Sequence, residues 1–140
     1  MIFSNGLDDK VRDGTKTQTR RLVKSGDTHF AEFFEGAIHG VQSNGRLKWE
    51  VGKTCAIQPK RGVKGNGRFR ITKIRKENVQ KINCKDCTAE GITTKEKGHD
   101  AGVHLREQFV ALWNSLHPKG KRWENNPLVW VLEIENVGRD

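Results

Sequence analysis

The chain has 140 residues and a mass of 15.9 kDa, which suits one compact domain spanning residues 1–140 and is too short for two of ordinary size. Hydrophobic residues make up 34% and charged residues 31%, a balance that predicts a small core with a well-solvated surface and argues against wholesale disorder. Lys and Arg number 26 against 17 Asp and Glu, so the formal charge of +9 favours a polyanionic partner.

The first third of the chain predicts one short helix and one irregular segment. Residues 6–13 carry two apolar residues four apart, with Ser4 or Asn5 as the expected N-cap and Gly14 as a left-handed residue at the end. The stretch 26–48 is rich in Gly, Ser, His and Asn. We expect a long loop or an irregular hairpin there.

Two strands and a basic loop are expected next. Residues 51–58 form a short apolar segment ended by Pro59, and residues 68–72 alternate polar and apolar side chains. Both patterns are typical of strands. Between them, residues 60–67 combine Gly, Asn and basic residues, which predicts a flexible basic loop.

The second half predicts two helices and a final strand. Asn83 or Asp86 can cap a short helix that Gly91 ends, and residues 104–117 carry an apolar stripe at helical spacing. A nearly continuous apolar run at 128–134 is typical of a buried strand. The order of elements predicts an α+β domain around a small open or closed sheet.

The positive charge is concentrated in two windows. Residues 10–24 have a balance of +5 and residues 46–76 a balance of +10, so the rest of the chain is net negative. This asymmetry favours a groove that faces phosphate groups, because charge on one side steers a polyanion toward it. A solvated basic face without a ligand is the alternative.

The cysteines and the hydropathy bear on metal, membrane and location. Cys84 and Cys87 form a CxxC pair that could chelate zinc, but His99 and His104 complete a ligand set poorly and no second CxxC is present. With Cys55 the thiols are odd in number, so we expect free cysteines, no metal and no cofactor.

No apolar run approaches the roughly 18 residues of a membrane span and no signal peptide is recognisable, which predicts a cytoplasmic protein with no membrane partner.

The segment 13–21 is the most informative for chemistry. It gathers one amine, three hydroxyls and two guanidinium groups, all donors that can hold phosphate or the polar edge of a base. If the run is extended, Lys16 and Arg20 lie on one face while Thr19 and Arg21 lie on the other, so Lys16 and Thr19 meet only where the backbone turns. An ordinary solvated basic strand is the alternative.

The pattern Gly14-x-Lys16-x-x-Thr19-x-Arg21 resembles the Gly-x-Lys-x-x-Glu-x-Arg signature of the ASCH domain, a member of the PUA-like superfamily of small β-barrels associated with RNA. Further segments resemble ASCH proteins of phages and prophages, namely residues 2–4, 16–21, 51–59, 67–71, 89–92, Trp113, 126–127 and 129–131. The resemblance implies a PUA-like barrel with flanking short helices and a basic cleft near Lys16.

The departure from the signature is also informative. Thr19 stands where the general signature has Glu, and this is similar to a bacterial ASCH subgroup that hydrolyses the acetyl group of N(4)-acetylcytidine with a Lys, a Thr three residues later and a downstream Glu. The resemblance therefore implies Lys16, Thr19 and Glu90 as the catalytic set, with Glu77 as an alternative acid. In such an amidohydrolase the Thr19 hydroxyl attacks, a neutral Lys16 accepts its proton, and Arg21 or backbone amides hold the oxyanion.

Two other functions stay open. One is a non-catalytic RNA-binding module in which Trp49 or Trp123 stacks on a base, and the other is a metal-independent ribonuclease. The expected partner is RNA or a modified nucleoside. The residues predicted to bind it are Thr17, Arg20, Arg21, Gln58, Lys60, Arg61, Lys64, Arg68, Arg70 and Trp123.

Overall fold

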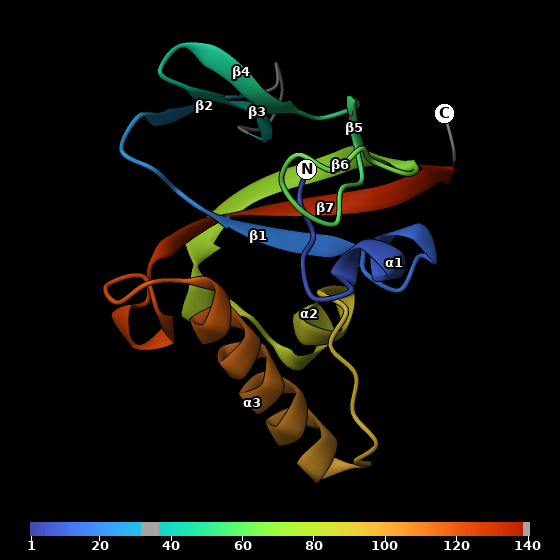
Figure 1. The fold of residues 1–140 in the computed structure, drawn as a ribbon. Coiled ribbons are helices and arrows are strands. Elements are labelled where there is room, and N and C mark those ends of the chain that lie inside the picture. The colour runs from blue at the N-terminus through green and yellow to red at the C-terminus, as the bar shows by residue number, and fades with distance from the viewer. Residues whose placement is uncertain (32–36, 139–140) are drawn as a thin grey trace.

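The computed structural model describes residues 1–31 and 37–138, with the side chain of His99 left out, and its centre is an antiparallel sheet (Figure 1). The strands are β1 Gln18–Leu22, β2 Asp27–Ala31, β3 Ile38–Ser43, β4 Arg46–Glu50, β5 Thr54–Ala56, β6 Arg68–Asn78 and β7 Leu128–Gly138. Their order in the sheet is β1-β7-β6-β3-β2, with β4 paired to β3 and β5 to β6. Together with three helices, this confirms the α+β class.

The predicted closure of the sheet into a barrel is wrong for the part of the chain that the structure describes. There, β1 pairs with β7 alone and β2 with β3 alone, so both are edge strands. Closure needs strands that pair around a full circle. In this chain β3 meets β6 at the single register pair Ile38 and Ile74, so the β2-β3-β4 meander turns away from the long β6-β7 ribbon (Figure 1).

The final strand explains how the core is divided between the two faces of the sheet. Alternate residues of a strand point to opposite faces. Trp130 and Leu132 belong to one buried apolar cluster, with residues of β5, β6 and the N-terminal segment, while Val129 and Val131 belong to a second cluster beneath the helices. The predicted strand at 128–134 reads as a continuous apolar run because both of its faces are buried.

Three α-helices accompany the sheet. They are α1 Leu7–Arg12, α2 Cys84–Ala89 and α3 His99–Leu116. Helices α2 and α3 lie on the side of β1-β7-β6 opposite the β2-β3-β4 meander (Figure 1). None of the helices in the described ranges is long and apolar enough to cross a membrane.

The helix boundaries test the predicted caps. Gly14 is left-handed (φ 83°) beyond α1, as predicted, but the N-cap of α1 is Gly6 with no side-chain cap, so the predicted Ser4 or Asn5 cap is wrong. Asn83 caps α2 as predicted and forms a reciprocal capping box with Asp86. The predicted helix 104–117 begins earlier, at His99.

The strands of the middle region differ from expectation in length. The predicted loop or hairpin 26–48 holds β2, β3 and the start of β4, with β-bulges that break the polar-apolar alternation; residues 32–36 of that prediction lie outside the described ranges. The predicted strand 51–58 shortens to β5, because Gly52 is left-handed (φ 91°) and turns the chain. The predicted strand 68–72 continues to Asn78, paired with β7 along its length.

Candidate functional site

A pocket of about 440 Å³ lies between the N-terminal segment, β1 and α3. Most of its polar side chains come from β1, from the residues just before and after this strand, and from Glu90, which caps the C-terminal end of α2. Its apolar wall includes Phe3, Trp49 and Trp113. The three residues predicted to be catalytic, Lys16, Thr19 and Glu90, therefore line one cavity.

Lys16 and Glu90 form a buried ion pair at this pocket. Lys16 is 3% exposed and Glu90 is 6% exposed, and Lys16 Nζ donates to Glu90 Oε1 (2.8 Å) and to the Glu90 carbonyl (2.9 Å). The backbone brings them together, because the Thr17 amide donates to the Ala89 carbonyl at the last turn of α2. Gly91 then turns the chain in the left-handed conformation (φ 95°), and a Cβ added at this position would lie 3.4 Å from the Lys16 Cβ.

The environment lowers the pKa of Lys16. Burial is the largest cause, because it disfavours the charged ammonium, and Arg21 and Arg20 add repulsion of like charge. Attraction and hydrogen bonding to Glu90 oppose the shift without cancelling it. A buried lysine of lowered pKa can give up its proton and act as a base, which a solvated lysine does rarely near neutral pH.

Arg20 holds the other oxygen of the same carboxylate. Its Nη1 donates to Glu90 Oε2 (2.8 Å) and to Gln18 Oε1 (3.0 Å), and its Nη2 donates to Glu77 Oε1 (3.1 Å). Arg20, predicted to bind substrate, lines the pocket and makes these contacts within the protein. Arg20 positions Glu90, and Glu77, the alternative acid, pairs with Arg20 and does not line the pocket.

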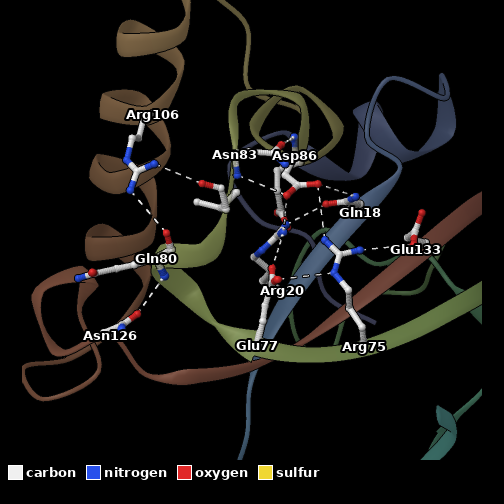
Figure 2. Close-up of polar contacts among 12 residues, drawn as sticks. Gln18, Arg20, Arg75, Glu77, Gln80, Asn83, Asp86, Arg106, Asn126 and Glu133 are labelled. Atoms are coloured by element: carbon white, nitrogen blue, oxygen red, sulfur yellow. Dashed lines mark hydrogen bonds and ion pairs between the residues drawn. The ribbon is translucent and has the colours of Figure 1, made fainter. Parts of the chain in front are cut away.

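A wider network anchors α2 to the sheet. Arg75 lies 3.5 Å from Asp86, 3.7 Å from Glu77 and 3.4 Å from Glu133, so it ties strands β6 and β7 to the helix (Figure 2). Asp86 also accepts a hydrogen bond from the Gln18 side chain (3.1 Å). The position of Glu90 at the C-terminal end of α2 is therefore fixed by ion pairs from two strands, from Arg20 of β1 and Arg75 of β6.

Thr19 and Arg21 line the pocket from β1. Thr19 is 4% exposed, and its hydroxyl has no hydrogen-bond partner within residues 1–31 and 37–138. Lys16 precedes the first residue of β1, Gln18, so strand alternation does not separate it from Thr19. Lys16 and Thr19 face the same cavity, the arrangement that the sequence allowed only with a turn of the backbone.

The last turn of α3 supplies a wall that sequence reasoning missed. The His117 ring stacks on Trp113 with 3.8 Å between centroids and 21° between planes, and its Nδ1 donates to the Trp113 carbonyl (2.8 Å). Burial lowers the pKa of His117. The apolar stripe of α3 predicts only that the helix faces the core. The signal that could have indicated the cavity is His117, which lies one turn beyond Trp113.

The other predicted binding residues lie outside this pocket. Exposed residues among them include Thr17, Lys60, Arg61 and Lys64. Three further side chains have partners within the protein: Gln58 forms hydrogen bonds with Val63 and Met1, Arg68 with Thr54, and Arg70 forms an ion pair with Glu135 (3.0 Å). Trp123 packs edge-on against Phe109 with the guanidinium of Arg106 5.0 Å from its ring centroid. It covers the second core cluster, whereas Trp49 lines the pocket.

The CxxC pair belongs to α2 and its packing. Cys84 is exposed, and Cys87 is buried in the second core cluster, where burial raises its pKa to about 11. Across the described side chains, no group of three or more His, Cys, Asp or Glu residues is arranged to hold a metal ion.

No protein-family model and no curated protein matches the chain. Three solved chains resemble it, including the following two. An ASCH domain from Lactobacillus crispatus JV V101 matches with a TM-score of 0.53 and 17% identity over 96% of this chain and 72% of that one. Protein EF3133 from Enterococcus faecalis V583, described with the family designation DUF984, matches with a TM-score of 0.59 and 17% identity over 96% of this chain and 69% of that one. The chain therefore has an ASCH-like fold.

Proposed function

We propose that this protein is a metal-independent amidohydrolase that removes the acetyl group from the exocyclic amine of N(4)-acetylcytidine. The observation that supports this most is the buried Lys16–Glu90 pair, 2.8 Å apart, in a pocket that also contains the Thr19 hydroxyl. These three groups supply a nucleophile, a base and an acid, which amide hydrolysis needs. The ASCH-like fold agrees with the sequence resemblance that assigned these roles.

The shape and lining of the pocket suit a nucleobase. A volume of about 440 Å³ falls within the range of about 300–1,000 Å³ that is typical of small-molecule sites. Phe3, Trp49 and Trp113 offer aromatic surface for a planar base. The polar groups lie on the β1 side, so a base held between the aromatic walls would present its substituent to Thr19.

The first half of the reaction uses the neutral form of the pair. In this form the proton of Lys16 has moved to Glu90 across 2.8 Å, which leaves at Lys16 the uncharged amine that burial favours. The Thr19 oxygen forms a bond to the acetyl carbon while its proton passes to Lys16. The bond between the acetyl carbon and the exocyclic nitrogen then breaks, and that nitrogen takes the proton of Glu90. Cytidine leaves and an acetyl ester of Thr19 remains.

The second half restores the enzyme. Water attacks the ester carbon and gives a proton to the Glu90 carboxylate, and the ammonium of Lys16 returns a proton to the departing Thr19 oxygen. Acetic acid leaves, and the neutral pair is ready again. Arg20 contributes by holding the Glu90 carboxylate, so it acts as a positioning residue.

A direct assay tests this proposal. The protein is incubated with N(4)-acetylcytidine, and cytidine is measured by chromatography. We expect turnover by the wild-type protein, a loss of about a hundredfold or more in Thr19→Val and Lys16→Met, and unchanged turnover in the exposed control Lys85→Ala. Turnover no faster than in buffer alone, or full activity of Thr19→Val, contradicts the proposal.

A second candidate function is non-catalytic RNA binding, and the loop 60–67 favours it. Lys60, Arg61 and Lys64 are exposed there and form no ion pair with the described residues. Replacing all three with Ala should weaken binding of single-stranded RNA and reduce the slope of log K against log salt by about 0.7 for each phosphate that the variant no longer neutralises. Binding that is independent of salt contradicts it. The same labelled RNA, found shortened after incubation, would point to the ribonuclease instead. The cytoplasmic location and the likeness to phage and prophage proteins stay predictions.

A further inference from the structure

The cations that line the pocket differ in whether they are neutralised. Lys16 and Arg20 both bind Glu90, and Arg20 also contacts Glu77. Lys48 lies 3.5 Å from Asp27. These cations have carboxylate partners within the protein, so they do not require an anion from outside.

Arg21, whose side chain is partly buried, is the exception. Its Nη2 donates to the Ile2 carbonyl (2.7 Å), and its guanidinium lies 5.2 Å from the Phe3 ring centroid. Its Nε is buried and has no hydrogen-bond partner. No carboxylate of the described ranges lies within 4 Å of it. Buried donors in native proteins are almost always satisfied, and a charge held away from water costs less with an anion beside it, so the unpartnered Nε and the lack of a carboxylate within 4 Å point to an anionic ligand.

Lys24 adds a second cation at the same pocket. It is exposed, lines the pocket, and has no carboxylate within 4 Å of its ammonium among the described residues. Asp27, the nearest acid along the chain, accepts instead from the Lys24 backbone amide (3.0 Å) and from the Trp130 indole (2.9 Å). Arg21 and Lys24 are therefore two cations of this pocket with no carboxylate within 4 Å among the described residues.

We propose that Arg21 and Lys24 bind the phosphate group of the ligand, so that the preferred substrate is a phosphorylated cytidine and not the free nucleoside. This inference rests on the proposed function for the identity of the base. A phosphate dianion matches two cations, and the planar guanidinium donates to phosphate oxygens in a fixed geometry. A phosphomonoester of a mononucleotide and a phosphodiester of RNA share this chemistry, and the experiment separates them.

The test compares equilibrium binding of four probes to the wild-type protein by calorimetry. The probes are cytidine, cytidine 5′-monophosphate, inorganic phosphate and a single-stranded RNA hexamer with one cytidine. We expect the monophosphate to bind at least tenfold more tightly than cytidine, and inorganic phosphate to compete with the monophosphate but not with cytidine. A hexamer that binds more tightly still, with the same dependence on Arg21, identifies the phosphodiester as the source.

Two variants and a control identify the residues. Lys24→Ala changes an exposed side chain and should weaken binding of the monophosphate several-fold while leaving cytidine unchanged; Arg21→Gln should remove most of the preference. Lys85→Ala, an exposed basic residue outside the pocket, should change neither. Equal affinity for cytidine and its monophosphate, or a preference that survives both variants, overturns the inference.

The outcomes also separate this inference from the proposed function. Hydrolysis of N(4)-acetylcytidine with no gain from the phosphate contradicts the inference alone. Binding of the monophosphate that depends on Arg21, without any hydrolysis, contradicts the proposed function alone. No measurable binding of any of the four probes overturns the inference outright.

Discussion

Lys16 Nζ lies 2.8 Å from Glu90 Oε1 although 74 residues separate them along the chain. The carboxylate is held from two sides, since Arg20 Nη1 donates to its other oxygen at 2.8 Å. Removing one partner of a buried ion pair leaves an uncompensated charge, whereas a pair that keeps a second cation loses less. The two contacts of Glu90 therefore predict which substitution at the site lowers the stability of the protein more.

Glu90→Gln should destabilise the protein more than Lys16→Met. The first change leaves Lys16 and Arg20 facing an amide, and we expect a loss of about 3–5 kcal/mol; the second leaves Glu90 still bonded to Arg20. Urea denaturation of both variants and of Lys85→Ala, an exposed residue of α2, measures the difference. A Lys16→Met protein less stable than Glu90→Gln would contradict this ordering.

Thr19→Val should separate catalysis from folding. Thr19 is 4% exposed and its hydroxyl has no hydrogen-bond partner in the described part of the chain, so replacing it with a methyl group of similar shape should change stability by no more than about 1 kcal/mol. Under the proposed mechanism the same change removes the nucleophile. Denaturation midpoints measured beside turnover test both statements, and a variant that unfolds readily would place Thr19 among the structural residues.

Local patterns predicted the elements of this fold better than its closure and its pocket. The periodicities of the final strand and of α3 were readable because each follows one spacing. The open sheet could not be predicted in this way, because it depends on a contact between distant strands: β3 meets β6 at a single register pair. In the same way, the stripe that includes Trp113 has the same spacing whether it faces a core or a cavity.

The basic window 46–76 shows why the charge pattern alone does not predict which basic residues are free to bind a ligand. Arg70 and Arg75 pair across the sheet with Glu135 and Glu133 of β7, about sixty residues away. Those partners lie in the part of the chain that was net negative by composition, and only the strand register brings them opposite. Glu90 entered the candidate site through the resemblance, since no local pattern places a carboxylate beside Lys16.

Asn83 should be the main local determinant of α2. Its side chain accepts from the Asp86 amide (2.8 Å), and Asp86 accepts in return from the Asn83 amide. Loss of such a cap in Asn83→Ala should cost about 1 kcal/mol, measured by urea denaturation, with Lys85→Ala as a control in the same helix. An unchanged midpoint would show that the ion pairs of Asp86 hold α2 without the cap.

The two cysteines of α2 should differ in reactivity. Cys87 is buried and burial raises its pKa to about 11, so little thiolate forms at pH 8, while Cys84 is exposed. Mass spectrometry after limited treatment with iodoacetamide should find Cys84 modified well before Cys87, and urea should abolish the difference. Equal rates in the native protein would contradict the burial of Cys87.

His117 should make stability depend on pH on the acid side of neutrality. Burial lowers its pKa in the folded protein below the ordinary value of 6.5, with Arg21 adding repulsion and the hydrogen bond to the Trp113 carbonyl opposing the shift. The unfolded chain therefore binds this proton more tightly, so the contribution of His117 is complete above pH 6.5 and is lost as the pH falls below it. Replacing it in His117→Phe keeps a ring for Trp113 to stack on and removes the titration. Denaturation between pH 5 and 8 should then show a shallower fall in stability for the variant than for the wild-type protein, and parallel curves would exclude His117 as the source.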